Sequence, residues 1–215
     1  MTYFDICKKM LEISKELLSL KLIYGTWGNV SCRYEDGLIV TPSRINYDVM
    51  TPDDMVHLDF DGRIICGTRI PTSERDIHRM IIANRPDVNA VVHTHSPYAC
   101  AAAAAGLTIE ALIEEIPQIV GGPIPCTAEY IPALDHIKLA THTVEAMGQV
   151  NAVLIRNHGP MCAGSSLDEA LICAQVTEKA AQMQLTLLGG VSYMPIAPEH
   201  VIAERKRFVE KYGKE

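Results

Sequence analysis

The sequence predicts an α/β fold in which a mixed sheet carries helices on both faces. Two pairs of short strand-like segments flank acidic turns near the start of the chain, and helical and strand-like segments alternate after about residue 70. No linker-like tract, low-complexity segment or internal repeat interrupts the 215 residues. We therefore expect a single domain over residues 1–215, because a chain of this length buries its own core without disulfide or metal support.

The first third of the chain predicts one helix and two β-hairpins. Apolar residues recur at helical spacing over residues 3–21, and Gly25 and Gly28 then break this pattern. Each hairpin has a turn that contains Asp-Gly, which is typical of a tight connection between antiparallel strands. The two hairpins pair residues 30–34 with 38–41 and residues 56–60 with 63–66.

The remaining two thirds alternate between helices and strands. Ser73, Ser96 and Ser166 stand where serine caps a helix N-terminus, and Gly106 stands where glycine ends one. Apolar runs separate these helices and predict buried strands. The expected helices cover residues 73–85, 96–105, 135–147, 166–189 and 199–212, and the expected strands cover residues 88–95 and 150–157.

Composition excludes several classes of protein. A mean hydropathy of +0.09 with 48% hydrophobic residues excludes a disordered chain, and no apolar run approaches the roughly 20 residues of a membrane span. The net charge of −7 argues against nucleic-acid binding, which needs clustered Lys and Arg. The seven cysteines are widely spaced, no Cys-x-x-Cys pair occurs, and the N-terminus lacks the features of a signal peptide. We therefore expect a cytoplasmic protein with reduced thiols.

Three histidines at the ends of apolar strands form the strongest chemical signal. His93 and His95 are two residues apart, so they share one face of a predicted strand, and His158 ends a second apolar strand. A His-x-His pair alone is also compatible with ordinary sheet residues. Three imidazoles with an open fourth position, however, are a known catalytic zinc arrangement.

Glu74 and His78 lie near the start of the helix expected over residues 73–85, and each admits two interpretations. Glu74 lies in the first turn, where the helix dipole favours a carboxylate, so it is either a capping-region residue or an acid/base beside the histidines. His78 follows one turn later and is either an outer partner of the site or a packed or solvated helix residue, and the second interpretation is favoured.

Small and hydroxyl-bearing residues gather in three loops that are suited to an anion. Residues 25–31 combine two glycines with hydroxyl and amide groups, and residues 41–44 and 72–73 add similar groups. Backbone amides in such loops and at helix N-termini bind phosphate. Ligand-free turns explain the same residues, so phosphate is one of two interpretations.

Taken together, these motifs resemble the class II aldolases of the L-fuculose-1-phosphate aldolase and L-ribulose-5-phosphate 4-epimerase type. Five segments appear in the family's order and with similar separations, and they extend over most of the chain. They are Gly-Thr-Trp-Gly-Asn-Val-Ser (25–31), Thr-Pro-Ser (41–43), Pro-Thr-Ser-Glu (71–74), Val-Val-His-Thr-His (91–95) and Asn-His-Gly (157–159).

The resemblance implies a three-layer α/β/α subunit with a largely antiparallel central sheet, assembled as a homotetramer with active sites at subunit interfaces. It implies that His93, His95 and His158 hold a divalent metal, normally Zn²⁺, with Mn²⁺ or Co²⁺ as alternatives. Glu74 would be the catalytic acid/base, and Tyr130 of a neighbouring subunit would be a proton donor. The substrate would be a ketose 1-phosphate, which is cleaved to dihydroxyacetone phosphate and a small aldehyde.

The resemblance also implies a phosphate pocket, with one departure from the family pattern. Arg44 stands where these aldolases carry glycine, so its guanidinium either binds the phosphate or blocks a close backbone approach. Tyr212 resembles a C-terminal tyrosine that closes over the substrate. The residues matched to the phosphate pocket are Gly28, Asn29, Ser43, Thr72 and Ser73.

Several activities use this scaffold, and the sequence favours one of them. Ser73-Glu74 resembles the aldolase branch, since the 4-epimerase branch carries Ser-Asp, whereas Thr-Trp-Gly-Asn-Val-Ser and Val-His-Thr-His-Ser resemble the epimerases. The alternatives are a 4-epimerase and another sugar-phosphate lyase, decarboxylase or dehydratase. The metal-free adducin head domain is a non-catalytic rival, and the joint presence of the three histidines and Glu74 argues against it.

Overall fold

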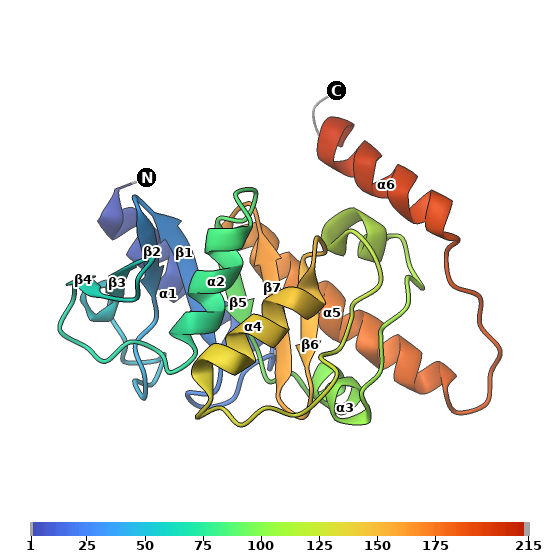
Figure 1. The fold of residues 1–215 in the computed structure, drawn as a ribbon, viewed down its shortest axis with the longest axis horizontal. Helices are drawn as coiled ribbons and strands as arrows, with labels where there is room; N and C mark the ends of the chain where they lie inside the picture. Colours follow the sequence, from blue (N-terminus) through green and yellow to red (C-terminus); the bar gives the residue numbers. More distant parts are fainter. Residues whose placement is uncertain (1, 213–215) are drawn as a thin grey trace.

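The computed structural model describes residues 2–212 and is built around one seven-stranded sheet (Figure 1). The strand order is β4-β3-β2-β1-β5-β7-β6, and every pairing between neighbouring strands is antiparallel. The strands are β1 (Asn29–Tyr34), β2 (Gly37–Val40), β3 (Val56–Asp59), β4 (Ile64–Cys66), β5 (Ala90–His93), β6 (Ala152–Ile155) and β7 (Gly159–Gly164). The predicted largely antiparallel sheet is confirmed.

Helices cover both faces of this sheet and complete a three-layer architecture. Neighbouring residues of β5 show the division: Val92 belongs to one apolar core and Val91 to the other. Figure 1 shows α2 and α4 on the near face, with α1, α3 and α5 behind the sheet. The helices are α1 (Tyr3–Ser19), α2 (Arg75–Asn84), α3 (Pro97–Ala105), α4 (His136–Met147), α5 (Leu167–Leu187) and α6 (Pro198–Lys211), and the short elements are η1 (Pro52–Asp54) and η2 (Ile116–Val120).

The strand β7 is the main element that differs from the sequence prediction. Gly159 and Pro160 indicated a loop, yet both lie in a buried strand between β5 and β6. Proline lacks an N–H but keeps its carbonyl, and the Pro160 carbonyl accepts a hydrogen bond from the Thr94 N–H at 3.2 Å. Because β7 returns beside β6 as a hairpin and inserts next to β5, the alternating segments produce an antiparallel rather than a mixed sheet.

Two predicted boundaries also shift in ways that matter for the histidines. The strand expected over residues 88–95 ends at His93, so His95 lies beyond the ladder instead of sharing a strand face with His93. The helix expected to be capped by Ser73 begins at Arg75, and Glu74 itself occupies the N-cap position. Helix starts vary by a residue or two between sequence signals and hydrogen-bonded geometry.

One face of β1 holds helix α2 along its whole length. Alternate residues of a strand share a face, and here Asn29, Ser31 and Arg33 all reach α2. Ser31 contacts the ring of His78, and the Arg33 guanidinium donates to the carbonyls of Ile82 and Arg85 near the end of the helix at 2.6 and 3.0 Å. We call this contact the β1–α2 seam.

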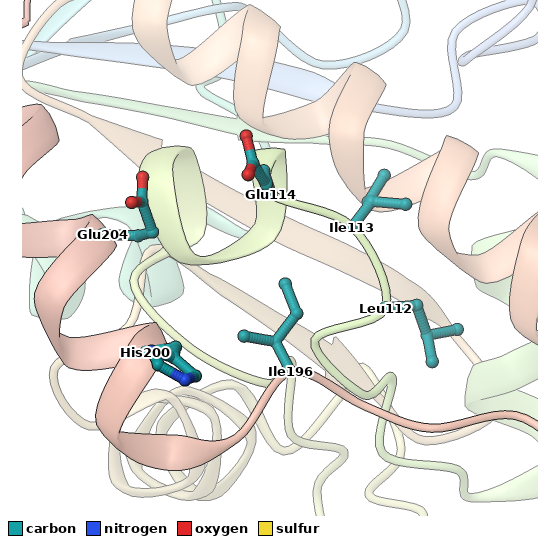
Figure 2. Close-up of a pocket in the computed structure, with 6 residues that line it drawn as sticks. All are labelled: Leu112, Ile113, Glu114, Ile196, His200 and Glu204. Carbon is teal, nitrogen blue, oxygen red and sulfur yellow. The ribbon is translucent and has the colours of Figure 1, made fainter.

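Helix α6 lies outside the sheet layers and packs against η2 (Figure 1). The Arg205 guanidinium donates to the carbonyls of Gln118 and Ile119, which joins the two elements. An open pocket of about 480 Å³ lies between the start of α6 and the segment that leads into η2, and Figure 2 shows its lining. The lining residues are Leu112, Ile113, Glu114, Ile196, His200 and Glu204, and none belongs to the predicted site. Within residues 2–212, no helix has both the length and the apolarity needed to cross a bilayer.

The seam predicts a specific stability cost. Replacing Arg33 with Met removes the guanidinium that donates to the partly buried Ile82 carbonyl at the C-terminal end of α2, and such a loss costs about 1–3 kcal/mol. We expect the free energy of unfolding, measured by urea denaturation, to fall by that amount. As the control, Arg63→Met removes an exposed arginine paired with Asp61 and should stay within about 0.5 kcal/mol of wild type. Equal losses in both variants would contradict a role for the seam.

Candidate active site

Four side chains from three separate segments converge at one end of the sheet. The Nε2 atoms of His93 and His95 lie 2.9 Å apart, and Glu74 Oε1 lies 2.8 Å from His158 Nε2. Glu74 Oε2 lies 3.4 Å from His93 Nε2. One ligand atom from each of the four residues falls within 4.8 Å of every other, so the structure brings together the predicted cluster.

Local structure explains how each side chain reaches this point. His93 ends β5, His95 follows two residues later, and His158 lies in the turn between β6 and β7. The three rings stand nearly perpendicular to one another, with centroids 4.8 to 5.1 Å apart. Glu74 approaches from the N-terminus of α2, because the seam brings that helix end against β1.

The hydrogen bonds of His93 show which of its ring nitrogens carries the proton. His93 Nδ1 lies 2.9 Å from the Pro160 carbonyl, which only accepts, so the ring proton is on Nδ1. Burial lowers the pKa of His93 to about 3, so the ring is neutral and Nε2 carries no proton. Burial also lowers the pKa of His95, which faces the same point.

Burial and hydrogen bonding act in opposite directions on Glu74. Its side chain is 11% exposed, and burial alone raises the pKa of a carboxyl group. The contact with His93 and the hydrogen bonds from His158 and Asn29 more than offset the effect of burial. They hold the pKa of Glu74 well below its ordinary value. Glu74 is therefore an ionised carboxylate in an almost dry setting.

This donor set fits a divalent transition metal. The inward lone pair of His93 Nε2 lies 2.9 Å from His95 Nε2, and the ionised Glu74 carboxylate faces the same point. Three imidazoles and one carboxylate oxygen are donors that zinc accepts. His93, His95 and His158 with Glu74 are thus a His₃/Glu site that can hold such an ion.

Buried polar residues connect Glu74 to the seam. Asn29 Nδ2 donates to Glu74 Oε2 at 2.6 Å, and Asn29 Oδ1 lies 2.5 Å from His78 Nε2. His78 is fully buried and its Nδ1 lies 2.6 Å from Ser31 Oγ. The packed environment expected of His78 is confirmed, and its contact with Asn29 supports the less favoured interpretation, an outer partner of the site. The spacing of four residues between Glu74 and His78 placed both on one face of the helix. Only the contact through Asn29 shows that the two side chains are connected.

The loops expected to bind phosphate lie side by side next to Glu74. Ser43 N–H donates to the Ile70 carbonyl at 2.8 Å, and Thr72 N–H donates to the Thr41 carbonyl at 3.1 Å. Ser73 follows on the exposed side, immediately before Glu74. Backbone hydrogen bonds therefore join the 41–44 and 70–73 loops at the N-terminus of α2.

Gly28 and Arg44 have unusual backbone conformations within these loops. At Gly28 (φ +121°), a Cβ would lie 2.9 Å from the His93 carbonyl, so only glycine allows this close approach. The buried Tyr47 hydroxyl donates to the Gly28 carbonyl at 2.6 Å and holds the loop. Arg44 adopts φ +60°, the left-handed region that glycine occupies most readily, and its side chain is exposed. This explains why glycine suits the position in the family that the sequence resembles.

The two predicted tyrosines do not reach the histidines within one copy of the chain. Tyr130 is exposed in the loop before α4, and the described chain shows no hydrogen bond or ring contact between it and the cluster. Tyr212 stacks on Phe208 with ring centroids 5.0 Å apart and lines a cavity with Val88 and Gly164. That cavity lies at the start of β5, the end opposite His93.

Trp27 is a further residue at the site that the sequence did not single out. Its ring centroid lies 5.7 Å from that of His95, and the side chain is 67% exposed beside the cluster. The sequence signal that could have identified it is a large aromatic residue between two glycines of a loop. Its closeness to His95 depends on the fold.

Comparison with known proteins gives a consistent family. A sequence profile described as "Class II Aldolase and Adducin N-terminal domain" matches residues 8–185. The L-fuculose phosphate aldolase of Escherichia coli (strain K12) is 32% identical over 208 residues, which cover 97% of this chain and 95% of that protein. The L-ribulose-5-phosphate 4-epimerase UlaF of Salmonella paratyphi B is 30% identical over 217 residues, covering 96% and 94%. A solved L-fuculose 1-phosphate aldolase matches with a TM-score of 0.90 and 25% identity, covering 95% and 96%.

The buried neutral His78 predicts how stability depends on pH. Burial lowers the pKa of His78 to about 3 in the folded state, whereas an unfolded histidine titrates near 6.5. Between these pH values the unfolded state binds a proton that the folded state does not, so stability falls as the pH is lowered from about 6.5 towards 3. We expect His78→Leu to remove up to about 1.4 kcal/mol per pH unit from this slope. Urea unfolding of chelator-treated protein at pH 7, 6, 5 and 4 tests this, and identical slopes would contradict it.

Proposed function

The chain belongs to the class II aldolase and adducin N-terminal domain family, and from this premise we propose that it cleaves a ketose 1-phosphate. The products would be dihydroxyacetone phosphate and a small aldehyde, with L-fuculose 1-phosphate or a related deoxyketose 1-phosphate as substrate. Membership in a family of metal-dependent sugar-phosphate aldolases and epimerases, together with the His₃/Glu site, sets the reaction class. The observation that carries the choice of aldolase is the buried, ionised Glu74 beside three converging histidines.

Three histidines would hold the metal, and we propose Zn²⁺, with Mn²⁺ or Co²⁺ as alternatives. A bound divalent metal acts as a Lewis acid that stabilises negative charge on the carbonyl and hydroxyl oxygens of the sugar. His93 is suited to this role because its Nδ1–H is held by Pro160 and its Nε2 lone pair faces inward. The Pro160 contact also fixes the orientation of the ring.

Glu74 would move the proton to and from the carbon that becomes part of dihydroxyacetone phosphate. It is ionised, so it can accept a proton, and its nearly dry setting raises its basicity once the histidine contacts are rearranged by substrate. Asn29 and His158 hold its two oxygens in defined directions, which limits the geometries of proton transfer.

The joined loops at the start of α2 would bind the substrate phosphate. Gly28, Asn29, Ser43, Thr72 and Ser73 supply amides and hydroxyls there, and the N-terminus of α2 favours a negative charge. Arg44 is a cation in these loops, and its guanidinium would pair with the phosphate. A local guanidinium of this kind allows a chain with a net charge of −7 to bind a phosphorylated substrate.

We further propose a cytoplasmic homotetramer whose sites are completed by neighbouring copies. Tyr130 is 58% exposed, and Tyr212 lies at the far end of β5, so neither tyrosine serves the histidine cluster of its own copy. Tyr130 of an adjacent copy would exchange a proton with the aldehyde oxygen, and Tyr212 of an adjacent copy would cover the substrate. A single domain over residues 1–215 would thus supply only part of each site.

A second candidate is 4-epimerisation of L-ribulose 5-phosphate. The 30% identity to an L-ribulose-5-phosphate 4-epimerase supports it, and the motifs around Trp27 and His95 resemble that branch. The carboxylate at position 74 is a glutamate, which favours the aldolase.

Product analysis tests the proposed function and its alternative together. Zinc-loaded protein is incubated with ketose 1-phosphates, including L-fuculose 1-phosphate, and with L-ribulose 5-phosphate, while dihydroxyacetone phosphate is coupled to a dehydrogenase. We expect dihydroxyacetone phosphate from at least one ketose 1-phosphate. Conversion of the 5-phosphate into an isomer without dihydroxyacetone phosphate would support the epimerase, and no turnover of any 1-phosphate would overturn the aldolase.

The matched control for this assay is Glu74→Gln, which keeps the shape of the side chain and removes its basicity. We expect cleavage to fall by about 10²–10⁴-fold, the range typical of a lost general acid/base, while zinc content stays at the wild-type level. Full activity in this variant would remove Glu74 from the proposed role.

Arg44→Gly separates the backbone and side-chain effects of this residue. Glycine relieves the left-handed conformation at φ +60°, so the free energy of unfolding should rise by up to about 1 kcal/mol. Losing the guanidinium should raise KM for the phosphorylated substrate by roughly tenfold, equivalent to about 1.4 kcal/mol for one charge-assisted contact. Steady-state kinetics and urea denaturation measure the two effects, with Arg63→Gly as an exposed control away from these loops. An unchanged KM would show that Arg44 does not bind phosphate.

A further inference from the structure

A continuous row of buried hydrogen bonds runs from β1 to Glu74 through the core. Ser31 Oγ lies 2.6 Å from His78 Nδ1, and His78 Nε2 lies 2.5 Å from Asn29 Oδ1. Asn29 Nδ2 then donates to Glu74 Oε2 at 2.6 Å. Ser31 and His78 are completely buried and Asn29 is 6% exposed, so water does not compete along the row.

The direction of each hydrogen bond in this row follows from its geometry. Asn29 Nδ2 donates to Glu74 Oε2, so the Asn29 oxygen faces His78. An oxygen at 2.5 Å requires His78 to carry its proton on Nε2. The neutral ring then accepts at Nδ1 from the Ser31 hydroxyl, and all three bonds point towards the carboxylate.

Reversing any member of the row has a cost. If the Asn29 amide turned over, its oxygen would face the Glu74 carboxylate at about the 2.6 Å spacing, and its NH₂ group would face the His78 N–H. The first contact would be repulsive in a buried setting, and so would the second while His78 keeps its proton on Nε2. His78 in this tautomer therefore supplies the buried N–H that engages the Asn29 oxygen in the observed orientation, although it does not touch Glu74.

We propose that His78 is a positioning residue that aligns Glu74 through Asn29. In its neutral Nε2–H form, it holds the Asn29 amide so that one carboxylate oxygen stays engaged and the other remains directed at the reacting centre. Hydrogen bonds that point the same way polarise one another, so the row acts as a unit. The catalytic consequence rests on the proposed acid/base function of Glu74, whereas the arrangement of the row does not.

A double-mutant cycle tests whether His78 acts through Asn29. Zinc-loaded His78→Leu, Asn29→Ala and the double variant are compared by kcat and KM for the ketose 1-phosphate that the wild type cleaves. Loss of an outer partner of a site residue typically costs 10–100-fold, so we expect kcat of His78→Leu to fall by that factor with KM within about threefold. The double variant should be within about twofold of Asn29→Ala. Losses that multiply in the double variant would overturn the proposal.

Two further variants separate positioning from packing. His78→Gln keeps an N–H donor near the place of Nε2, and we expect it to recover at least tenfold over His78→Leu. His57→Leu removes another buried histidine, one that packs against Tyr34, and kcat should stay within about twofold of wild type. Zinc content, measured on each variant, should match wild type. Zinc loss in His78→Leu, or no recovery in His78→Gln, would overturn the positioning role.

A spectroscopic measurement tests the row independently of activity. Long-range ¹H–¹⁵N correlation spectra of histidine side chains, recorded at pH 7 on wild type and on His78→Gln for assignment, report the protonation of each ring nitrogen. We expect a neutral His78 with the proton on Nε2, and an Nδ1–H or doubly protonated ring would overturn the proposal. If wild type cleaves no ketose phosphate, the proposed function fails. This spectrum then tests the proposed direction of the hydrogen bonds in the row on its own.

Discussion

The β1–α2 seam is the contact on which the position of the Glu74 carboxylate depends. Glu74, His78 and Ile82 recur every four residues along α2, and Asn29, Ser31 and Arg33 recur every two along β1. Two residues of strand and one turn of helix have similar lengths, so the polar groups meet at successive levels. The same seam therefore satisfies carbonyls at the end of the helix and places Glu74 beside the histidines.

Electrostatics at the site are balanced by burial rather than by exposed charge. His93 and His78 are neutral because desolvation opposes their protonation, and Glu74 is ionised because the contact with His93 and the hydrogen bonds from His158 and Asn29 compensate for its burial. Inward lone pairs and a carboxylate are then available together at neutral pH. The convergence of these histidines and Glu74 costs free energy without a cation and is well suited to binding one. This is consistent with a metal-dependent enzyme of the aldolase family.

Close backbone approaches bring the ligand-bearing turns together. Gly28 allows its loop to pass next to the His93 carbonyl, and Gly159 lies against the Thr94 carbonyl at the start of β7. A side chain at either glycine would push apart segments that carry Asn29 or His158. The site is therefore assembled from turns whose spacing depends on small residues, while β5 and β7 supply the rigid frame.

The sequence by itself determined the α/β class, most helices, the first hairpins and the four residues of the His₃/Glu cluster, because these depend on local periodicity and on motifs of specific residue types. It could not reveal β7, since Gly159 and Pro160 have poor strand propensity and only pairing with β5 and β6 makes them a strand. It also favoured ordinary packing for His78. The tertiary structure decided that role, because the link from His78 to Glu74 passes through Asn29, which is 45 residues away from Glu74 in the chain. Contacts between distant segments leave no period in the sequence, so only the folded arrangement of β1 and α2 reveals them.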